Sequence, residues 1–291
     1  MRPLVLDTDI GTDVDDLLAL LLILTEPGIR LLGVTTVHGD TKLRAAMARA
    51  VLQQSGCATV PVIAGESATL SGTPIDWKGH EGQWFGELPA YESPGIPAAG
   101  FIRSVAQRAA GELEVLAIAP LTNLAVALRE DAGLAPLIKH LYIMGGAFWP
   151  PHPEHNFATD PQATREVLAA PIPTTIIGLD VTLTMILSRS DVMRLTAAST
   201  SLARIVRDQS DRWLAFLNRD FYHLHDPLAA LAITRPDLFR FEHGTATLDQ
   251  SLRSRLLPRT DAGTRVAAAV EVHTAREVIL GRLGRVLSSE S

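Results

Sequence analysis

The stretch DTDIGTDVDD, residues 7–16, places five carboxylates within ten residues. It follows the apolar run PLVL at residues 3–6 and precedes the apolar run LLALLL at residues 17–22. This pattern predicts an acidic loop between a buried strand and a buried helix. Two like charges about 4 Å apart repel by roughly 4 kcal/mol at an effective dielectric constant near 20. The sequence therefore predicts that a divalent cation offsets the repulsion.

Other interpretations of the acidic stretch are a helix cap, an EF-hand and a phosphatase loop. Asp13 or Asp15 could cap the helix while the remaining acids face water, but a cap uses only one or two of them. Carboxylate oxygens suit Ca²⁺ or Mg²⁺ better than Zn²⁺. An EF-hand is excluded because Gly11 is the fifth residue of the stretch and Leu18 is the twelfth. The D-x-D-x-T loop of aspartyl phosphatases is excluded because Gly11 occupies the position of the Thr.

Composition narrows the class of protein. The chain has 291 residues, 47% of them apolar, and a formal net charge of −6, which argues against binding nucleic acid through its backbone. The longest apolar run, Leu17–Leu24, is too short to span a bilayer, so we expect no membrane partner. A strand that starts by Pro3 leaves no room for a signal peptide, and we expect a cytoplasmic protein. Cys57 is the single cysteine and is interpreted as core filler.

Short β-rich runs alternate with helical patterns through the first two thirds of the chain. The predicted strands are 3–6, 30–37, 59–64, 114–119, 140–144 and 174–179, and the predicted helices are 15–25, 42–55, 102–110, 121–129 and 161–169. The last third predicts helices at 201–218, from 225 and at 275–287, with two or three strands between 241 and 272. We therefore predict one α/β domain over residues 1–291, with a mainly parallel, Rossmann-like central sheet flanked by helices. The long segment 71–100 predicts an irregular loop.

Polar residues follow the predicted strands, and in open α/β sheets ligands bind at the carboxyl ends of the strands. These residues are Asp7, Asp9, Asp15, Asp16, His38-Gly39-Asp40, residues 118–123, residues 144–148 leading into Glu154-His155-Asn156, and Asp180. We expect them to line one edge and to form the active site. In His225-Asp226-Pro227, Asp226 is either an ordinary helix cap before Pro or a functional residue at a rigid helix terminus.

Two further patterns allow competing hypotheses. The pairs His223/His225 and His152/His155 could hold zinc in a metallohydrolase, although such pairs also arise by chance in a chain with nine histidines. The aromatic residues in or near the predicted loops could stack on a planar ligand or could only pack loops onto the body. They are Trp77, Trp84, Trp149, Phe221 and Tyr222.

Taken in order, these motifs resemble the inosine-uridine-preferring nucleoside hydrolase family, which cleaves the N-glycosidic bond of ribonucleosides. The motifs that carry the resemblance are residues 7–20, Gly33-Val34-Thr35-Thr36-Val37, Ala119-Pro120-Leu121-Thr122-Asn123, Met144-Gly145-Gly146, Glu154-His155-Asn156, Asp160-Pro161 and His225-Asp226-Pro227. They cover nearly the whole chain. The resemblance implies a Ca²⁺-dependent enzyme of the nucleoside hydrolase fold that releases free base and ribose, and a homodimer or homotetramer.

The resemblance also implies roles for individual residues. Asp9, Asp16 and Asp226 would be side-chain ligands of Ca²⁺, with the backbone carbonyl of Ile118 completing the protein shell. Asp15 and Asp226 would hold the ribose 2′- and 3′-hydroxyls. The 3′ and 5′ side of the ribose would be held by Glu154 and Asn156. Asp9 would be the general base for the metal-bound water.

Cleavage of the C–N bond develops positive charge on the ribose, which an anionic site stabilises, and the leaving base needs a proton or a hydrogen bond. His225 is the first candidate for this acid and His80 the second. The acidic loop is two residues longer than the commoner family form, so Asp13 has no counterpart and its role is open. Asp40 stands where many members carry Asn and would add negative charge beside the ribose. The base preference is open. The same site could also serve another N-riboside, or could bind Ca²⁺ and ribose without turnover.

Overall fold

Strand β1 (Arg2–Thr8) ends where the acidic stretch begins, and its last five residues are all buried. It pairs in parallel with β2 (Ile29–Thr36) on one side and with β4 (Leu113–Ala117) on the other. The computed structural model describes residues 1–83 and 88–289. A strand that is apolar on both sides suits the interior of a parallel sheet that helices cover on both faces.

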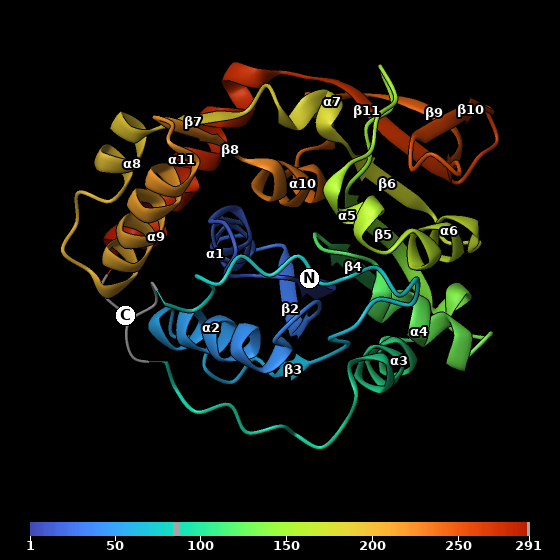
Figure 1. Ribbon diagram of the computed structural model, residues 1–291, viewed down its shortest axis with the longest axis horizontal. Helices are drawn as coiled ribbons and strands as arrows, with labels where there is room; N and C mark the ends of the chain where they lie inside the picture. Colours follow the sequence, from blue (N-terminus) through green and yellow to red (C-terminus); the bar gives the residue numbers. More distant parts are fainter. Residues whose placement is uncertain (84–87, 290–291) are drawn as a thin grey trace.

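The described residues form a nine-stranded sheet in the order β10-β9-β11-β6-β5-β4-β1-β2-β3 (Figure 1). All neighbours pair in parallel except β9, which is antiparallel to both β10 and β11. Its remaining strands are β3 (Val62–Ala64), β5 (Ile138–Met144), β6 (Thr174–Ile177), β9 (Phe239–Leu248), β10 (Ser254–Pro258) and β11 (Thr264–Val270). The portion 3-2-1-4-5-6 has the strand order of a dinucleotide-binding fold. From β1 the chain moves outward to β2 and β3 on one side of the sheet, and from β4 it moves outward to β5 and β6 on the other side. A ligand-binding crevice is expected between β1 and β4, where this order reverses.

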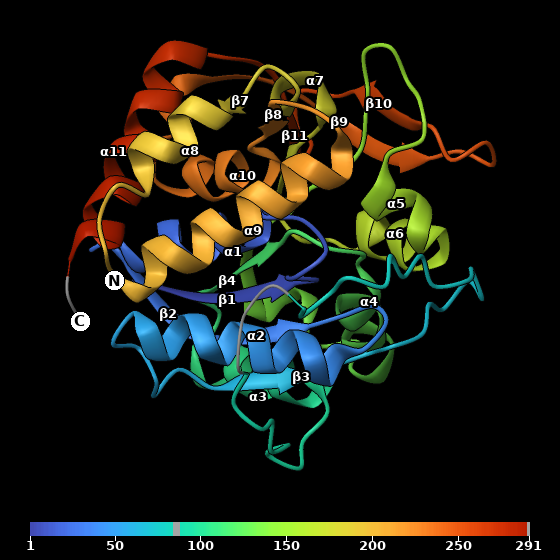
Figure 2. The ribbon, with the colours of Figure 1, turned by 60° about the vertical axis from the view of Figure 1, so that its left-hand side comes forward.

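Helices cover both faces of the sheet. On one face, α1 (Asp15–Leu24), α2 (Thr41–Gln54) and α10 (His225–Thr234) share an apolar core with α9 (Ser201–Leu217) and α11 (Val272–Ser288). On the other face, α3 (Ala98–Arg108), α4 (Thr122–Glu130) and α6 (Pro161–Ala169) form a second core. Figure 2 shows α8 (Arg189–Leu195), α9 and α11 on the side of the molecule away from α3. None of the described helices is both long and apolar enough to cross a bilayer.

The predicted α/β domain with a mainly parallel, helix-flanked sheet is confirmed, and so are the long helices. The predicted strand 59–64 is shorter, at Val62–Ala64, and the C-terminal strands number three in the described residues and extend the main sheet. The sequence analysis missed the short elements α5 (His155–Thr159), α7 (Leu179–Thr182), β7 (Ile186–Ser188), α8 (Arg189–Leu195) and β8 (Phe221–His223).

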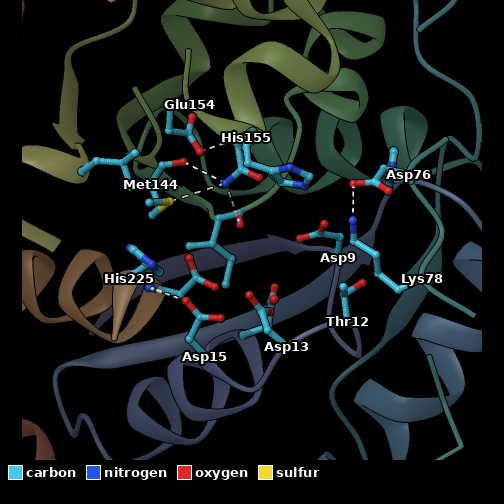
Figure 3. Close-up of a pocket in the computed structure, with 16 residues that line it drawn as sticks. Asp9, Thr12, Asp13, Asp15, Asp76, Lys78, Met144, Glu154, His155 and His225 are labelled. Carbon is cyan, nitrogen blue, oxygen red and sulfur yellow. Dashed lines mark hydrogen bonds and ion pairs between the residues drawn. The ribbon is translucent and has the colours of Figure 1, made fainter. Parts of the chain in front are cut away.

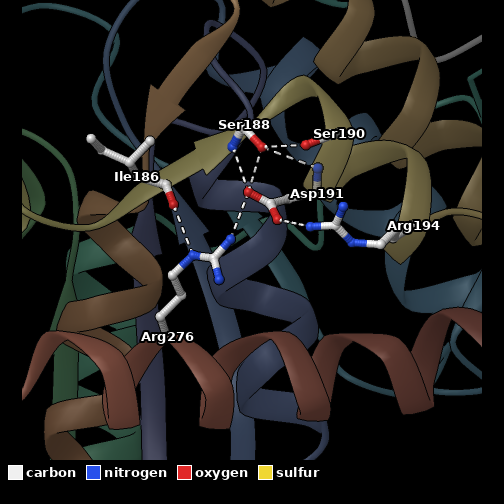
Figure 4. Close-up of polar contacts among 6 residues, drawn as sticks. All are labelled: Ile186, Ser188, Ser190, Asp191, Arg194 and Arg276. Atoms are coloured by element: carbon white, nitrogen blue, oxygen red, sulfur yellow. Dashed lines mark hydrogen bonds and ion pairs between the residues drawn. The ribbon is translucent and has the colours of Figure 1, made fainter.

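A buried carboxylate joins the short elements β7 and α8 to the last helix (Figure 4). Asp191 of α8 accepts hydrogen bonds from the N–H and hydroxyl of Ser188 at 2.9 and 2.6 Å and forms an ion pair with Arg276 of α11 at 2.6 Å. Arg276 also donates to the carbonyl of Ile186 at 3.2 Å. Burial alone would raise the pKa of Asp191, but the hydrogen bonds from Arg276 and Ser188 outweigh it and lower this pKa to about 2. The network therefore fixes α11 against the rest of the domain.

Candidate active site

The acidic stretch forms the loop between β1 and α1, at the predicted edge of the sheet. Gly11 has φ of 114° and packs closely on the side chain of Met47, so a residue with a Cβ fits poorly there. Helix α1 begins after Val14, which makes no side-chain cap. The capping interpretation of Asp13 or Asp15 is therefore wrong.

Three carboxylates of this loop converge. The ligand oxygens of Asp13, Asp15 and Asp16 all lie within 4.8 Å of one another, and Asp15 and Asp16 are 4% and 3% exposed. Burial raises the pKa of both Asp15 and Asp16 well above the ordinary value, and the charges of neighbouring carboxylates, Asp13 among them, raise it further. Buried hard oxygen donors that repel one another are the donor set that a Ca²⁺ or Mg²⁺ ion would stabilise.

These three carboxylates line a cavity that brings together residues from distant parts of the chain (Figure 3). The backbone amide of Asp226 donates to Asp15 at 3.4 Å, which joins α10 to α1. Burial, followed by the charge of Asp15, raises the pKa of Asp226 well above the ordinary value. The cavity is lined by Asp9, Thr12, Asp13, Asp15, Asp16, His38, Asp76, Lys78, Ile118, Met144, Glu154, His155, Asn156, Leu179, His225 and Asp226.

Most of the residues that the sequence predicted for the site lie in this lining. They are Asp9, Asp15, Asp16, Ile118, Glu154, Asn156, His225 and Asp226. The close carboxylate group differs from the predicted metal ligands, because it contains Asp13 and Asp15 beside Asp16. The sequence pattern suggested no role for Asp13 beyond a possible helix cap.

Glu154 and Asn156 are held by backbone groups. The Glu154 carboxylate caps α5 and accepts from the amides of Gly146 and Asn156 at 2.8 Å and of Phe157 at 3.0 Å. Burial raises the pKa of Glu154, while these three hydrogen bonds act in the opposite direction. The amide nitrogen of Asn156 donates to the carbonyls of Ile118 and Met144, each at 3.2 Å. The two side chains thus fix one wall of the cavity.

His225 is the first residue of α10. Its Nδ1 lies 2.7 Å from the hydroxyl of Thr182 in α7. Burial lowers the pKa of His225 to about 4, although the charge of Asp13 acts in the opposite direction. The imidazole is therefore neutral at pH 7, so it can donate a hydrogen bond but carries no extra proton. The role of His225 toward the leaving base stays a prediction.

Two predicted substrate-binding residues lie outside the lining. Asp40 is exposed and accepts from the amide of Leu43 at 3.0 Å, because it precedes α2 and caps it. His80 is buried, with its Nε2 2.8 Å from the carbonyl of Thr12 and its ring 4.8 Å from that of Phe216. Asp40 thus caps α2 and His80 contacts the acidic loop, and neither of them lines the cavity.

Asp7, the first acid of the stretch, points away from the cavity. It accepts hydrogen bonds from Thr35 at 2.6 Å and from the amide of Asn123 at 2.7 Å, and burial raises its pKa to about 7. Asp7 thus joins β1 to β2 and to the start of α4.

The alternative sites do not form among the described residues. Within residues 1–83 and 88–289, Asp13, Asp15 and Asp16 are the one group of three or more potential ligands close enough for a metal, so the histidine pairs assemble no zinc site. Trp149 lies beside a separate depression with Asp180. Trp84 lies outside the described residues.

Two lining residues were predicted only as part of their motifs, without a role of their own. His38 and His155 stand beside Asp40 and Glu154 in the sequence, so the motifs marked their positions. No sequence signal placed Asp76 and Lys78, which form an ion pair at 2.6 Å in the 71–100 loop, at the cavity.

Comparison with known proteins decides the family. A family model for inosine-uridine preferring nucleoside hydrolases matches residues 4–285. The chain belongs to this family. Uridine nucleosidase 1 of Arabidopsis thaliana is 30% identical over 269 residues, 84% of this chain and 78% of that protein. The pyrimidine-specific ribonucleoside hydrolase RihA of Shewanella baltica is 30% identical over 257 residues, 82% of this chain and 79% of that protein.

A solved structure supports the fold independently. The purine-preferring ribonucleoside hydrolase from Gardnerella vaginalis superposes with a TM-score of 0.89 at 24% identity and covers 99% of both chains. The nucleoside hydrolase fold predicted from the sequence is therefore confirmed, and the chain is an enzyme of this family.

Proposed function

We propose that this chain hydrolyses the N-glycosidic bond of ribonucleosides in a Ca²⁺-dependent reaction that releases free base and ribose. The observation that carries the proposal is the convergence of the carboxylates of Asp13, Asp15 and Asp16, of which Asp15 and Asp16 are buried, in a cavity that Asp9 and Asp226 also line. The family match over residues 4–285 supports the reaction class.

The donor set fits a calcium ion. Asp9, Asp16, Ile118 and Asp226 line the cavity, and Asp13 and Asp15 add two carboxylates. When bound, Ca²⁺ would lower the pKa of a water molecule and would orient the ribose diol. Its charge would also relieve the repulsion that raises the pKa values of the buried carboxylates.

The side chains of this site suit a transition state with a positively charged sugar. As the C–N bond breaks, positive charge develops on the ribose ring, and fixed carboxylates stabilise it more than they stabilise the neutral substrate. We assign to Asp9 the removal of a proton from the attacking water, and to Asp15 and Asp226 the binding of the ribose hydroxyls. Glu154 and Asn156, which backbone contacts hold in place, would bind the opposite side of the ribose.

His225 would assist departure of the base as a hydrogen-bond donor. Its ring is neutral because burial lowers its pKa to about 4, and its contact with Thr182 at 2.7 Å fixes the ring orientation. A neutral donor stabilises negative charge on the leaving base without transferring a whole proton.

The test compares the same chemical change at two aspartates. Asp9→Asn should lower kcat for uridine and inosine by about 10²- to 10⁴-fold, the usual effect of removing a general base. Asp40→Asn keeps a good helix cap on an exposed residue outside the cavity, so its kcat should match that of the wild type. Full activity of Asp9→Asn would contradict the assignment.

Uridine is the first substrate to test, because relatives 30% identical to this chain are described as a uridine nucleosidase and a pyrimidine-specific ribonucleoside hydrolase. A homodimer or homotetramer and a cytoplasmic location stay predictions. Light scattering of the purified protein measures the first of these directly.

A further inference from the structure

His38 follows β2 in a backbone conformation that needs support. Its φ is 69°, in the left-handed region that residues other than Gly seldom adopt. Its N–H donates to the carbonyl of Glu66 at 2.8 Å, and its own carbonyl accepts from Nε of Arg44 at 2.8 Å. Conformations of this kind persist where the surrounding structure holds them, and they concentrate at functional sites.

Arg44 ties His38 to the acidic loop. Its guanidinium is fully buried, and it bonds to backbone carbonyls rather than to a carboxylate: those of His38, Asp9 and, at 3.0 Å, Ile10. It also donates to the hydroxyl of Thr12 at 3.2 Å. His38 is thereby fixed relative to the carboxylates on the cavity floor.

The ring of His38 lacks the partners that buried polar groups normally have. The residue is 3% exposed and lines the cavity, yet neither Nδ1 nor Nε2 has a hydrogen-bond partner among the residues that the structure describes. An unpaired buried polar group costs about 1–3 kcal/mol, and native structures contain few of them. Two unpaired nitrogens on the side chain of a residue whose backbone a buried arginine holds in place indicate that the partner is a ligand.

We propose that His38 is a further ligand-contacting residue, whose ring donates or accepts a hydrogen bond to a polar atom of the bound ribonucleoside. The inference rests on the proposed function. A neutral imidazole presents one N–H donor and one acceptor nitrogen, which suits a ribose hydroxyl or a polar edge of the base. Within the His38-Gly39-Asp40 motif, the inference assigns the polar contact with the substrate to His38, because Asp40 caps α2.

Two variants separate hydrogen bonding from backbone effects. His38→Asn and His38→Gly both tolerate positive φ, but only Asn retains a donor and an acceptor. We expect His38→Gly to raise KM for uridine and inosine by about five- to tenfold, the value of one hydrogen bond, with kcat changed less than KM. His38→Asn should restore KM to within about threefold of the wild type. Inhibition by ribose and by uracil then shows which half of the nucleoside is contacted, since only the Ki of that half rises.

His140→Asn is the control for general destabilisation. His140 lies on β5, where its ring contacts the hydroxyl of Thr175 at 2.8 Å, and it does not line the cavity. This variant should change Tm without changing KM.

An unchanged KM in His38→Gly, or an equal rise in His38→Gly and His38→Asn, would overturn the inference while leaving the proposed function intact. A wild-type protein that neither binds nor hydrolyses uridine or inosine would refute the proposed function, and this inference with it.

Discussion

Asp13→Asn should have opposite effects on the metal-free and the calcium-loaded protein. The carboxylates of Asp13, Asp15 and Asp16 lie within 4.8 Å of one another, so each ionised pair repels by at least about 3.5 kcal/mol at an effective dielectric constant of 20. Neutralising Asp13 removes two such pairs, about 7 kcal/mol in a fully ionised group. The metal-free protein avoids part of this repulsion by binding a proton. Protonating an ordinary aspartate at pH 7 costs about 4 kcal/mol. Asp13→Asn can therefore stabilise the metal-free protein by no more than about 4 kcal/mol.

Thermal unfolding in a chelator and in millimolar Ca²⁺ measures both effects. A relief of 2 to 4 kcal/mol corresponds to an increase in Tm of roughly 4 to 8 °C for the metal-free variant, at about 2 °C per kcal/mol. Added Ca²⁺ should raise the Tm of the wild type more than that of Asp13→Asn, because the variant offers one charged ligand fewer. Asp40→Asn, a change of the same type on an exposed residue, should behave as the wild type. A lower Tm for Asp13→Asn in chelator, or an equal response of both proteins to Ca²⁺, would refute the reasoning.

Three further substitutions test other parts of the structure. His225→Gln should lower kcat by about 10- to 100-fold through loss of a hydrogen bond to developing charge. The kcat of the wild type should show no titration of His225 from pH 6 to 8, because burial lowers the pKa of His225 to about 4. An inflection of the wild-type kcat near pH 6.5 that the variant lacks would contradict this. Asp191→Asn should lower the unfolding free energy by about 2 kcal/mol above pH 4, because the pKa of Asp191 falls from 3.8 to about 2 on folding. The stability difference between wild type and variant should disappear as the pH falls through 2, and kcat at neutral pH should not change. Asp160→Asn should lower the unfolding free energy in urea by about 2 kcal/mol. The buried carboxylate of Asp160 accepts hydrogen bonds from the amide of Leu70 at 2.7 Å and the hydroxyl of Thr122 at 2.8 Å. An unchanged urea midpoint would show that these bonds contribute nothing to stability.

The fold and the location of the site were predictable because they depend on long patterns. The apolar strand at 3–6, the acidic stretch and the apolar helix after it place the carboxylates at the end of β1, and the parallel sheet brings the strand ends together. Elements such as α7 and β8 are too short for hydrophobic periodicity to reveal them.

The roles of single residues within a loop were harder to predict. Asp40 and His38 are two residues apart, and only the positive φ of His38 and the start of α2 at Thr41 decide which of them faces the cavity. The convergence of Asp13 with Asp15 likewise depends on the path of the longer loop, which Gly11 and Arg44 determine through tertiary contacts.

Incubation of the purified protein with uridine in phosphate-free buffer, with and without Ca²⁺ after chelation, tests the central claim most directly. Nuclear magnetic resonance spectra would follow uracil and ribose together. The account predicts equal amounts of both products, formed only when Ca²⁺ is restored. Calcium-loaded protein that releases no uracil from uridine and no hypoxanthine from inosine would contradict it, as would equal turnover by the metal-free protein.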